Sequence, residues 1–476
     1  MLIYPPGKLY QRGEDRSQGN IDDSSATSMR ASNDLGYAAA VLLKDGYEVL
    51  LKDYQTERLT LDNLLRDIKV FSPDLLMLSV TNSTIFDDLE VAAQVANQNM
   101  TIILKGAIFY NATPDMLSML DLIHIDYLCG GEIEYSIARI ADFALRGIGA
   151  REEIPNVFYK REDGSFAKTF FDSWEHDLDS IPFPARRLMN NTLYVRPDTN
   201  EMMATIQTSR GCSAQCIYCL SPDISGKNVR YRSVANVMSE LEECYRLYGI
   251  RNFFFKSDTF TLDAGWVKNL CEHIITSPLH KKIAFAANSR THPLRRETLE
   301  YMKRAGCFMV AFGFESGSTE TMRRIKKGAT IEHNRQAALW CKQLRLPFYG
   351  FFMIGFPWET PTHLKQTREH IFECKPDFIE IHMALPYYGT ELYEMCRDHG
   401  TLAGGTLGND YFNSNINGTQ NCSVKELIKF RRDTMRIFYT RPSYLAQRLA
   451  ECLRSPKIIA SYARYGLRLW QKNRNS

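Results

Sequence analysis

The sequence has no apolar run that approaches the roughly 18 residues needed to span a membrane. Residues 1–6 lack the positively charged start and the long apolar core of a secretory signal. The 12 cysteines show no spacing typical of a disulfide framework, which suits a reducing compartment. These absences predict a cytoplasmic protein.

The chain also has little net charge, since its 476 residues carry a formal charge of only +3 at pH 7. This balance argues against a nucleic-acid partner. The exception is residues 423–476, which hold 13 Lys and Arg against three Asp and Glu. No G-x-G-x-x-G motif follows the first predicted strand, so a nicotinamide cofactor is disfavoured. The sequence also offers no Ser/His/Asp set or pair of carboxylates that would compete for a catalytic role.

What the chain does contain is a C-x₃-C-x₂-C motif, formed by Cys212, Cys216 and Cys219. Three thiolates on one loop are a soft-ligand site, whereas iron–sulfur clusters are normally held by four. One iron would therefore stay open to a substrate-like ligand. Structural zinc needs a fourth ligand, and the chain has no second C-x₂-C or H-x₃-H arm. The other nine cysteines are scattered singly, as small core residues are.

The segment Thr208–Pro222, which contains this motif, resembles the cluster loop of the radical S-adenosylmethionine (radical SAM) superfamily. The resemblance implies that the three cysteines hold a [4Fe–4S] cluster whose fourth iron chelates the amino and carboxylate groups of SAM. It also implies that Tyr218 lies against the adenine. Reduction of the cluster would then cleave SAM to a 5′-deoxyadenosyl radical.

Residues 1–150 alternate between short apolar runs and amphipathic stretches. Strands are predicted near 2–4, 48–53, 75–80, 102–104 and 125–128, and helices near 26–45, 60–70, 86–98 and 133–146. This alternation predicts an α/β fold with a doubly wound, Rossmann-like parallel sheet. Its ligand crevice should lie at the carboxyl ends of the strands.

Small and polar residues follow these strands. They are Ser79, Thr81, Gly106, Gly130, Gly131 and Glu132. Ahead of a radical SAM loop, the domain resembles the cobalamin-binding domain of class B radical SAM enzymes, for which the Gly-Gly-Glu stretch is typical. The resemblance implies that these residues bind cobalamin. The D-x-H-x-x-G motif, which puts a histidine on cobalt, is absent, so a bound cobalamin would lack a histidine ligand. The glycines could equally serve only the turns of the fold.

Residues 151–200 are predicted to be a linker, because they contain turn residues rather than periodic ones. Residues 201–400 resume the alternation, with strands near 203–208, 252–256, 283–287, 308–314, 349–354 and 378–383. Six such units predict a partial, TIM-like (β/α)6 barrel with its chemistry at the carboxyl ends of the strands. The polar residues at these ends are Asp258, Asn288, Arg290, Glu315 and Ser316.

Three further motifs of this domain resemble superfamily motifs in the same order. Gly313–Gly317 resembles G-x-E-S, Gly355–Thr360 resembles G-x-P-x-E-T, and Pro386–Tyr393 resembles the turn after the sixth strand. The resemblance, which covers residues 1–400, implies that SAM is bound by Tyr218 together with the five polar residues at the strand ends.

Residues 401–476 are predicted to form a basic α-helical region. Apolar residues recur in it at helical spacing, namely Leu445, Leu449 and Leu453, then Ile459, Tyr462 and Leu469. A basic amphipathic helix can rest on an anionic membrane surface. It can equally cap the barrel with its apolar side and leave its arginines in water. The sequence leaves both alternatives open.

Together these parts predict a cobalamin-dependent radical SAM enzyme that methylates an unactivated carbon. A substrate radical would take the methyl group from methylcobalamin, which a second SAM would restore. Oxidative cyclisation or rearrangement uses the same parts and is the alternative. Methylthiolation of tRNA would need a second cysteine trio in the N-terminal domain, where Cys129 stands alone. Retention of the three cysteines and Glu315 argues against a non-catalytic cobalamin-binding protein.

The expected partners are a small-molecule or lipid-like substrate and a reductant such as flavodoxin or ferredoxin. We expect no nucleic acid. Peripheral membrane contact through the basic C-terminal helices is a further expectation.

Overall fold

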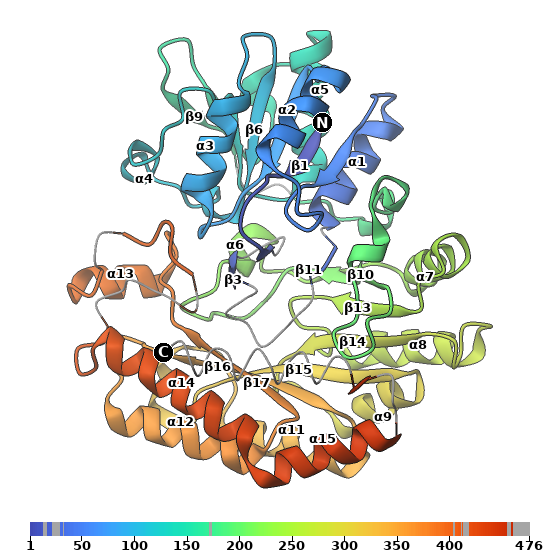
Figure 1. Ribbon diagram of the computed structural model, residues 1–476, viewed down its shortest axis with the longest axis vertical. Coiled ribbons are helices and arrows are strands. Elements are labelled where there is room, and N and C mark those ends of the chain that lie inside the picture. Colours follow the sequence, from blue (N-terminus) through green and yellow to red (C-terminus); the bar gives the residue numbers. More distant parts are fainter. Residues whose placement is uncertain are drawn as a thin grey trace.

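The computed structural model describes residues 1–12, 17–20, 29–31, 33–170, 174–402, 405–410, 412, 418–454 and 458–459. Two sheets organise the chain, one of seven strands and one of six. Figure 1 shows the first sheet with its helices above the second, and the segment that carries β11 and α6 between them. The predicted cluster loop joins these two elements, so it lies where the two halves of the molecule meet.

The N-terminal sheet has the order β4-β1-β5-β6-β7-β8-β9. Its strands are β1 (Leu2–Tyr4), β4 (Leu51–Asp53), β5 (Leu75–Ser79), β6 (Thr101–Lys105), β7 (Tyr127–Cys129), β8 (Val157–Lys160) and β9 (Phe166–Lys168). The first five are parallel, and β8 and β9 are antiparallel. All five predicted strands are present.

Both faces of this sheet are buried, which is why its strands are continuous apolar runs. The helices of this half are α1 (Asn33–Lys44), α2 (Leu61–Phe71), α3 (Ile85–Val95), α4 (Pro114–Ser118) and α5 (Ile133–Arg146). Leu2 packs with α1 and α5 on one face, whereas Ile3 packs with α2, α3 and α4 on the other. The sheet is therefore doubly wound, as predicted.

The first sheet extends into the stretch 151–200, which the sequence predicted to be a linker. The hairpin of β8 and β9 lies in this stretch and adds two strands to the sheet beside β7. After β9, short 3₁₀ turns lead to the second sheet, in agreement with the turn residues of the sequence. The domain boundaries themselves stay predictions.

The second sheet is parallel throughout, with the order β10-β13-β14-β15-β16-β17. Its strands are β10 (Met203–Gln207), β13 (Asn252–Lys256), β14 (Ala284–Ser289), β15 (Cys307–Glu315), β16 (Phe348–Ile354) and β17 (Phe378–Met383). The helices between them include α7 (Val234–Tyr248), α8 (Ala264–Thr276), α9 (Arg296–Arg304), α10 (Thr319–Arg324), α11 (Ile331–Leu344) and α12 (Pro361–Cys374). Phe253, Phe255 and Phe285 pack without exposure between the sheet and these helices. The predicted partial barrel is present, with β10 and β17 as its edges.

The C-terminal helix α14 (Val424–Thr440) covers the edge strand β17 (Figure 1). The Ile379 N–H donates to the Tyr439 hydroxyl oxygen at 2.9 Å, and that hydroxyl donates to the Ile379 carbonyl at 2.8 Å. Arg431 Nε donates to the Ile381 carbonyl at 2.7 Å. These side chains take the place of a seventh strand, because they satisfy backbone groups that an edge leaves unpaired.

The next helix, α15 (Pro442–Arg454), exposes the predicted leucine stripe. Leu445, Leu449 and Leu453 are 54%, 63% and 78% exposed. Tyr462 and Leu469 lie outside the described residues. This leucine stripe does not cap the barrel, and α14 covers the edge strand instead. None of the helices in the described ranges is both long and apolar enough to cross a bilayer.

We expect Tyr439→Phe to lower the stability of the chain by about 2 kcal/mol. The ring would stay packed, but the buried N–H and C=O of Ile379 would lose their partner. The midpoint of urea unfolding measures the effect. The matched control is Tyr248→Phe, at a half-buried tyrosine whose pKa shift involves no hydrogen bond of the hydroxyl. Equal midpoints for both variants would show that α14 does not cap the edge in this way.

Candidate active site

The loop of residues 211–220 joins β11 (Ser209–Arg210) to α6 (Ser221–Ile224) and carries the three predicted ligands. Cys212, Cys216 and Cys219 are all partly exposed. Among the other nine cysteines, eight are buried and only Cys452, on α15, is partly exposed. The thiols that a ligand can reach are therefore concentrated in this loop.

The loop is fixed to the barrel by its backbone. Gly211 N–H donates to Asp258 Oδ2 at 3.1 Å, just after β13. Cys212 N–H donates to the Gly226 carbonyl at 3.0 Å. Gly211 has a φ of 96°, and a Cβ there would overlap the Asn228 carbonyl, so only glycine fits. Asp258, predicted to bind SAM, thus holds the cluster loop in place.

The thiols lie close enough together to influence one another. Burial raises the pKa of both Cys212 and Cys216, and the neighbouring Cys219 raises each further. Within the described ranges, no three His, Cys, Asp or Glu side chains are placed to hold a single metal ion.

Glu315 stands beside the loop at the end of β15. It forms a buried ion pair with Lys327, and both residues are 6% exposed. Burial raises the pKa of the Tyr218 phenol well above its usual value, and Glu315 raises it further through charge and a hydrogen bond. A Cβ on Gly313 would collide with both members of the ion pair. The G-x-E-S motif is thus a glycine that leaves room for a paired carboxylate.

The backbone at Glu315 is strained, with a φ of 62° after an irregularity in the pairing of β15 with β16. Residues other than Gly and Asn rarely adopt this backbone conformation. Such strain concentrates at functional sites. Sequence reasoning identified Glu315 but missed Lys327. The only sequence signal at this site was the spacing of Gly313 and Glu315 in the G-x-E-S motif. That spacing does not indicate Lys327, which follows Glu315 by 12 residues.

The second motif, Gly355–Thr360, is a turn held by a buried carboxylate. Glu359 is fully buried, and it accepts hydrogen bonds from the N–H groups of Gly355 at 2.7 Å and Phe356 at 3.3 Å. Gly355 has a φ of 92°. The ring of Phe356 lies 6.1 Å from that of Tyr218. The motif therefore closes beside the predicted adenine site.

Burial raises the pKa of Glu359 to about 7. The unfolded chain releases this proton near pH 4.5, so the folded state binds more protons between pH 4.5 and 7. Stability should fall by up to about 3 kcal/mol as pH rises through this window, and then level off. We expect Glu359→Gln to remove that part of the pH dependence of urea unfolding. Glu297→Gln, at an exposed site on α9, should leave it unchanged. A slope that persists in Glu359→Gln would contradict this account.

The remaining predicted SAM residues differ in what they offer. The Asn288 amide oxygen is buried at the end of β14 without a hydrogen-bond partner in the described chain. Arg290 is partly buried, and its Nε donates to the His292 carbonyl at 3.3 Å. Ser316 is fully buried, and its hydroxyl pairs with Thr367 Oγ1 at 3.0 Å. Asn288 and Arg290 can meet a ligand, whereas the Ser316 hydroxyl is engaged inside the protein.

The three predicted cobalamin glycines are explained by the packing of the chain itself. A Cβ on Gly106 would lie 2.9 Å from the Val80 carbonyl oxygen. One on Gly130 would overlap the backbone of Tyr110, and one on Gly131 would lie 3.0 Å from Asn156. The packing of the fold alone accounts for these three glycines, and their contact with cobalamin stays a prediction. They leave room for neighbouring loops of the fold.

The two hydroxyl residues at the carboxyl ends of the first sheet are buried, each 4% exposed. Ser79 Oγ donates to Asp34 Oδ2 at 3.2 Å, and Thr81 Oγ1 pairs with Thr84 Oγ1 at 2.9 Å. The residue missed here is Asn33, at the start of α1. It is fully buried, and neither polar atom of its amide has a partner in the described chain.

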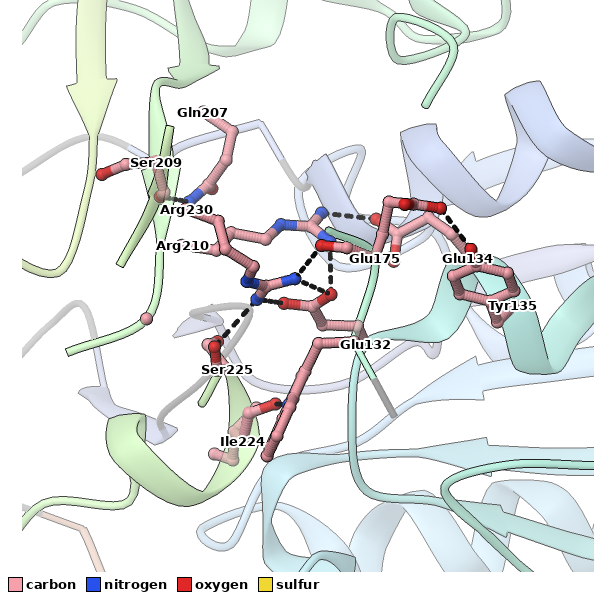
Figure 2. A network of polar contacts seen from close by, with 12 residues as sticks. Glu132, Glu134, Tyr135, Glu175, Gln207, Ser209, Arg210, Ile224, Ser225 and Arg230 are labelled. Carbon is pink, nitrogen blue, oxygen red and sulfur yellow. Dashed lines mark hydrogen bonds and ion pairs between the residues drawn. The ribbon is translucent and has the colours of Figure 1, made fainter. Parts of the chain in front are cut away.

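Glu132 belongs to a network of ion pairs that joins the two halves of the molecule (Figure 2). Arg230 donates to Glu132 at 2.5 Å, and Arg210 lies 3.3 Å from the same carboxylate. Arg210 also pairs with Glu134, in the first turn of α5. All four side chains are at most 9% exposed. Glu132 therefore helps to hold the start of the cluster loop, and its contact with cobalamin stays a prediction.

The network connects directly to the cluster loop, because Arg210 stands two residues before Cys212. Arg210 and Arg230 face each other in the antiparallel ribbon of β11 and β12 (Arg230–Tyr231). Arg230 also donates to the Ser225 carbonyl at 2.8 Å. The end of β7 in the first sheet and the start of the cluster loop in the second half are consequently held together.

The sequence pattern of the Radical SAM superfamily matches residues 206–371, which include the cysteine motif. The chain therefore contains a radical SAM domain. It is 28% identical over 419 residues to the uncharacterized methyltransferase PH0819 of Pyrococcus horikoshii, covering 88% of this chain and 89% of that one. It is 26% identical over 420 residues to the cytidylyl-2-hydroxyethylphosphonate methyltransferase of Streptomyces wedmorensis, covering 77% and 78%.

Other relatives of the chain carry different names. The anaerobic magnesium-protoporphyrin IX monomethyl ester cyclase of Cereibacter sphaeroides is 23% identical over 385 residues, covering 76% of this chain and 60% of the cyclase. Among solved structures, the radical S-adenosylmethionine methyltransferase TsrM from Kitasatospora setae, with cobalamin and a [4Fe–4S] cluster bound, superimposes with a TM-score of 0.66. That match has 16% identity and covers 86% of this chain and 78% of TsrM. The chain therefore shares the fold of TsrM.

Proposed function

We propose that this enzyme methylates an unactivated carbon of a small molecule, with a [4Fe–4S] cluster, SAM and cobalamin as cofactors. The observation that carries the proposal is the cluster loop. Its three partly exposed thiols lie on a loop that is hydrogen-bonded to Asp258, just after β13, and that follows Arg210, which pairs with Glu132 and Glu134 beyond the end of β7. One centre thus lies between the two halves, where a radical site and a methyl donor can serve the same substrate.

Cys212, Cys216 and Cys219 would hold the cluster, which supplies the electron that cleaves SAM. Asn288 fits SAM because its buried amide oxygen lacks a donor and would accept one from the ligand. Arg290 offers a cation for a carboxylate. Glu315, oriented by Lys327, holds the Tyr218 hydroxyl and so fixes the ring beside the adenine. The barrel walls around this centre exclude water from a radical.

Cobalamin would lie between the first sheet and the cluster loop. Asn33 supports this assignment, because a buried amide with both polar atoms free suits a ligand whose rim bears amide groups. The segment Phe86–Glu90, where the D-x-H-x-x-G histidine is absent, lies in α3. Within it, the Asp88 carboxylate accepts a hydrogen bond from Thr84 at 2.5 Å. We infer that cobalt receives no histidine from this segment.

The test is anaerobic reconstitution of the full chain with iron, sulfide and cobalamin, followed by reduction with SAM. We expect corrin bands beside the broad iron–sulfur absorption, and 5′-deoxyadenosine as a product. The control is a variant in which all three loop cysteines are alanine. Formation of no more 5′-deoxyadenosine than in this control would overturn the proposal.

The second candidate is oxidative cyclisation or rearrangement, which the likeness to the cyclase of Cereibacter sphaeroides favours. The same assay separates the two reactions. Methyl transfer produces S-adenosylhomocysteine together with 5′-deoxyadenosine, whereas cyclisation produces 5′-deoxyadenosine without it. For either reaction we infer that a small electron-transfer protein such as flavodoxin or ferredoxin supplies the reductant. Contact of the exposed α15 leucines with a membrane surface stays a prediction.

A further inference from the structure

Two arginines stack on phenylalanines of one small apolar cluster on the inner face of the barrel. The cluster comprises Met203, Phe254 and Ala286, with Phe308 and Met309 packed against it. It is separate from the outer core, which contains the neighbouring Phe253 and Phe255. Because side chains of a strand alternate between faces, Phe254 points inward.

The guanidinium of Arg196 lies 3.6 Å from the ring centre of Phe308, and that of Arg30 lies 3.9 Å from the ring centre of Phe254. Arg196 is neutralised, since its Nε and Nη2 each donate to Asp198 at 2.6 Å. In the described part of the chain, no carboxylate forms an ion pair with Arg30. Among the residues that the structure describes, one arginine of the cluster therefore has a counterion and the other has none.

Arg30 remains a cation despite its surroundings. Burial lowers its pKa to about 10, which still leaves the guanidinium charged near neutral pH. Arg30 is only partly exposed, and a charge partly withdrawn from water without a counterion is costly, so such groups are normally paired. Stacking on one phenylalanine compensates only part of this cost. The uncompensated part indicates that a ligand completes the site.

The position of Arg30 places it within reach of a substrate. It acts on Phe254 of β13 and, electrostatically, on Tyr349 of β16, so it lies on the concave side of the sheet that these strands share. Tyr349 stacks against Phe351 with ring centres 4.7 Å apart, and both are half-buried. Lys256 follows Phe254 by two residues and lies on the same face of β13. This inner wall is aromatic and carries positive charge.

The distance from Arg30 to the cluster loop follows from the strand. Asp258, which accepts the Gly211 hydrogen bond, stands four residues beyond Phe254. At roughly 3.3 Å per residue, Phe254, on which Arg30 stacks, lies on the order of 13 Å from Asp258 along the strand direction. A molecule bound to Arg30 can therefore extend along the aromatic wall and present its other end to the cluster loop.

We infer that Arg30 binds the anionic group of the substrate, so that the substrate is a carboxylic acid or a phosphate ester with an apolar body. Arginine suits this role, because its planar fork donates two parallel hydrogen bonds to either group. The inference rests on the proposed function only in placing the reacting carbon near the cluster loop. Recognition of the anion itself depends on Arg30 and the inner wall.

The test measures binding of three probes of similar shape to the full chain by ligand-observed NMR, without SAM or reductant. The probes are 3-phenylpropionate, phenyl phosphate and the neutral 3-phenylpropanamide. We expect the wild type to bind at least one of the two anions about tenfold more tightly than the amide. The preferred anion distinguishes a carboxylate from a phosphate substrate.

Variants assign that preference to Arg30. We expect Arg30→Gln to lose it, and Arg30→Lys to retain part of it because the charge remains. Arg196→Gln is the matched control, since its guanidinium already has a carboxylate, and it should bind as the wild type does. Circular dichroism confirms that each variant is folded. The inference would be overturned if the wild type bound the amide and the anions with equal affinity. It would also be overturned if Arg30→Gln kept the preference for anions.

Failure here can be told apart from failure of the proposed function. Binding of the probes needs neither the cluster nor cobalamin, whereas cleavage of SAM to 5′-deoxyadenosine needs no substrate anion. A chain that forms 5′-deoxyadenosine but shows no preference for anions would keep the function and refute the role of Arg30.

Discussion

Replacement of Cys212 by alanine should abolish the cleavage of SAM. Two thiolates would remain on the loop, too few to hold a cubane with one open iron. We expect 5′-deoxyadenosine to fall to the level formed without enzyme, and the broad iron–sulfur absorption and bound iron to fall with it. Quantification of 5′-deoxyadenosine by mass spectrometry and of iron by colorimetry measures both. Cys216→Ala and Cys219→Ala should behave alike, since the three thiols act as a unit.

Cys452→Ala is the matched control for this prediction. Cys452 is also a partly exposed thiol, but it lies on α15 rather than on the cluster loop. Its removal should change neither iron content nor SAM cleavage. Undiminished 5′-deoxyadenosine formation by Cys212→Ala would show that the loop does not hold the catalytic cluster.

The fold was largely predictable because its strands carry local signals. Both faces of the first sheet are buried, so its parallel strands are continuous apolar runs that stand out between amphipathic helices. The hairpin of β8 and β9 was missed because it pairs with β7 through a contact that no local pattern indicates. Tyr439 and Arg431 cap β17 across about 50 residues or more of sequence, and such long-range contacts are equally invisible.

The candidate site was predictable where chemistry requires a fixed spacing along the chain. The three cysteines and Glu315 follow such spacings, whereas Lys327 and Asn33 belong to no motif. The ion pairs of Glu132 could not be predicted, for a physical reason. The sequence shows a carboxylate after a strand, but not that Arg210 and Arg230 approach it from the other half of the molecule. A glycine likewise indicates a close approach without saying which group approaches.

Arg210→Ala should be the most destabilising single change between the two halves. It would leave Glu134, a buried carboxylate, without its ion-pair partner, while Glu132 would keep Arg230. Removal of one member of a buried ion pair typically costs about 3–5 kcal/mol. We expect a loss of this size in urea unfolding of the full chain. Arg146→Ala breaks the exposed pair with Asp142 and should cost about 0.5 kcal/mol or less.

The pH dependence gives a second signature. Burial alone would raise the pKa of Glu134, but the charge and hydrogen bond of Arg210 hold it below the usual 4.5. The wild-type ion pair therefore contributes its stability above pH 4.5 and loses it as pH falls through the lower folded value. In Arg210→Ala the unpaired Glu134 takes up a proton more readily. The stability difference between wild type and variant should consequently shrink on acidification, and a difference that is constant with pH would contradict the assignment.

A double variant separates stability from positioning. In Arg210→Met with Glu134→Leu, apolar side chains replace the buried pair, and such replacements are often neutral or stabilising. We expect stability to recover toward the wild-type value. SAM cleavage and the optical spectrum of bound cobalamin should then report whether the link between α5 and the cluster loop is needed in itself. If the network serves only stability, the double variant will match the wild type in both. If it sets the position of the loop, 5′-deoxyadenosine formation will stay low in a chain that is stably folded, because Cys212 follows Arg210 by only two residues.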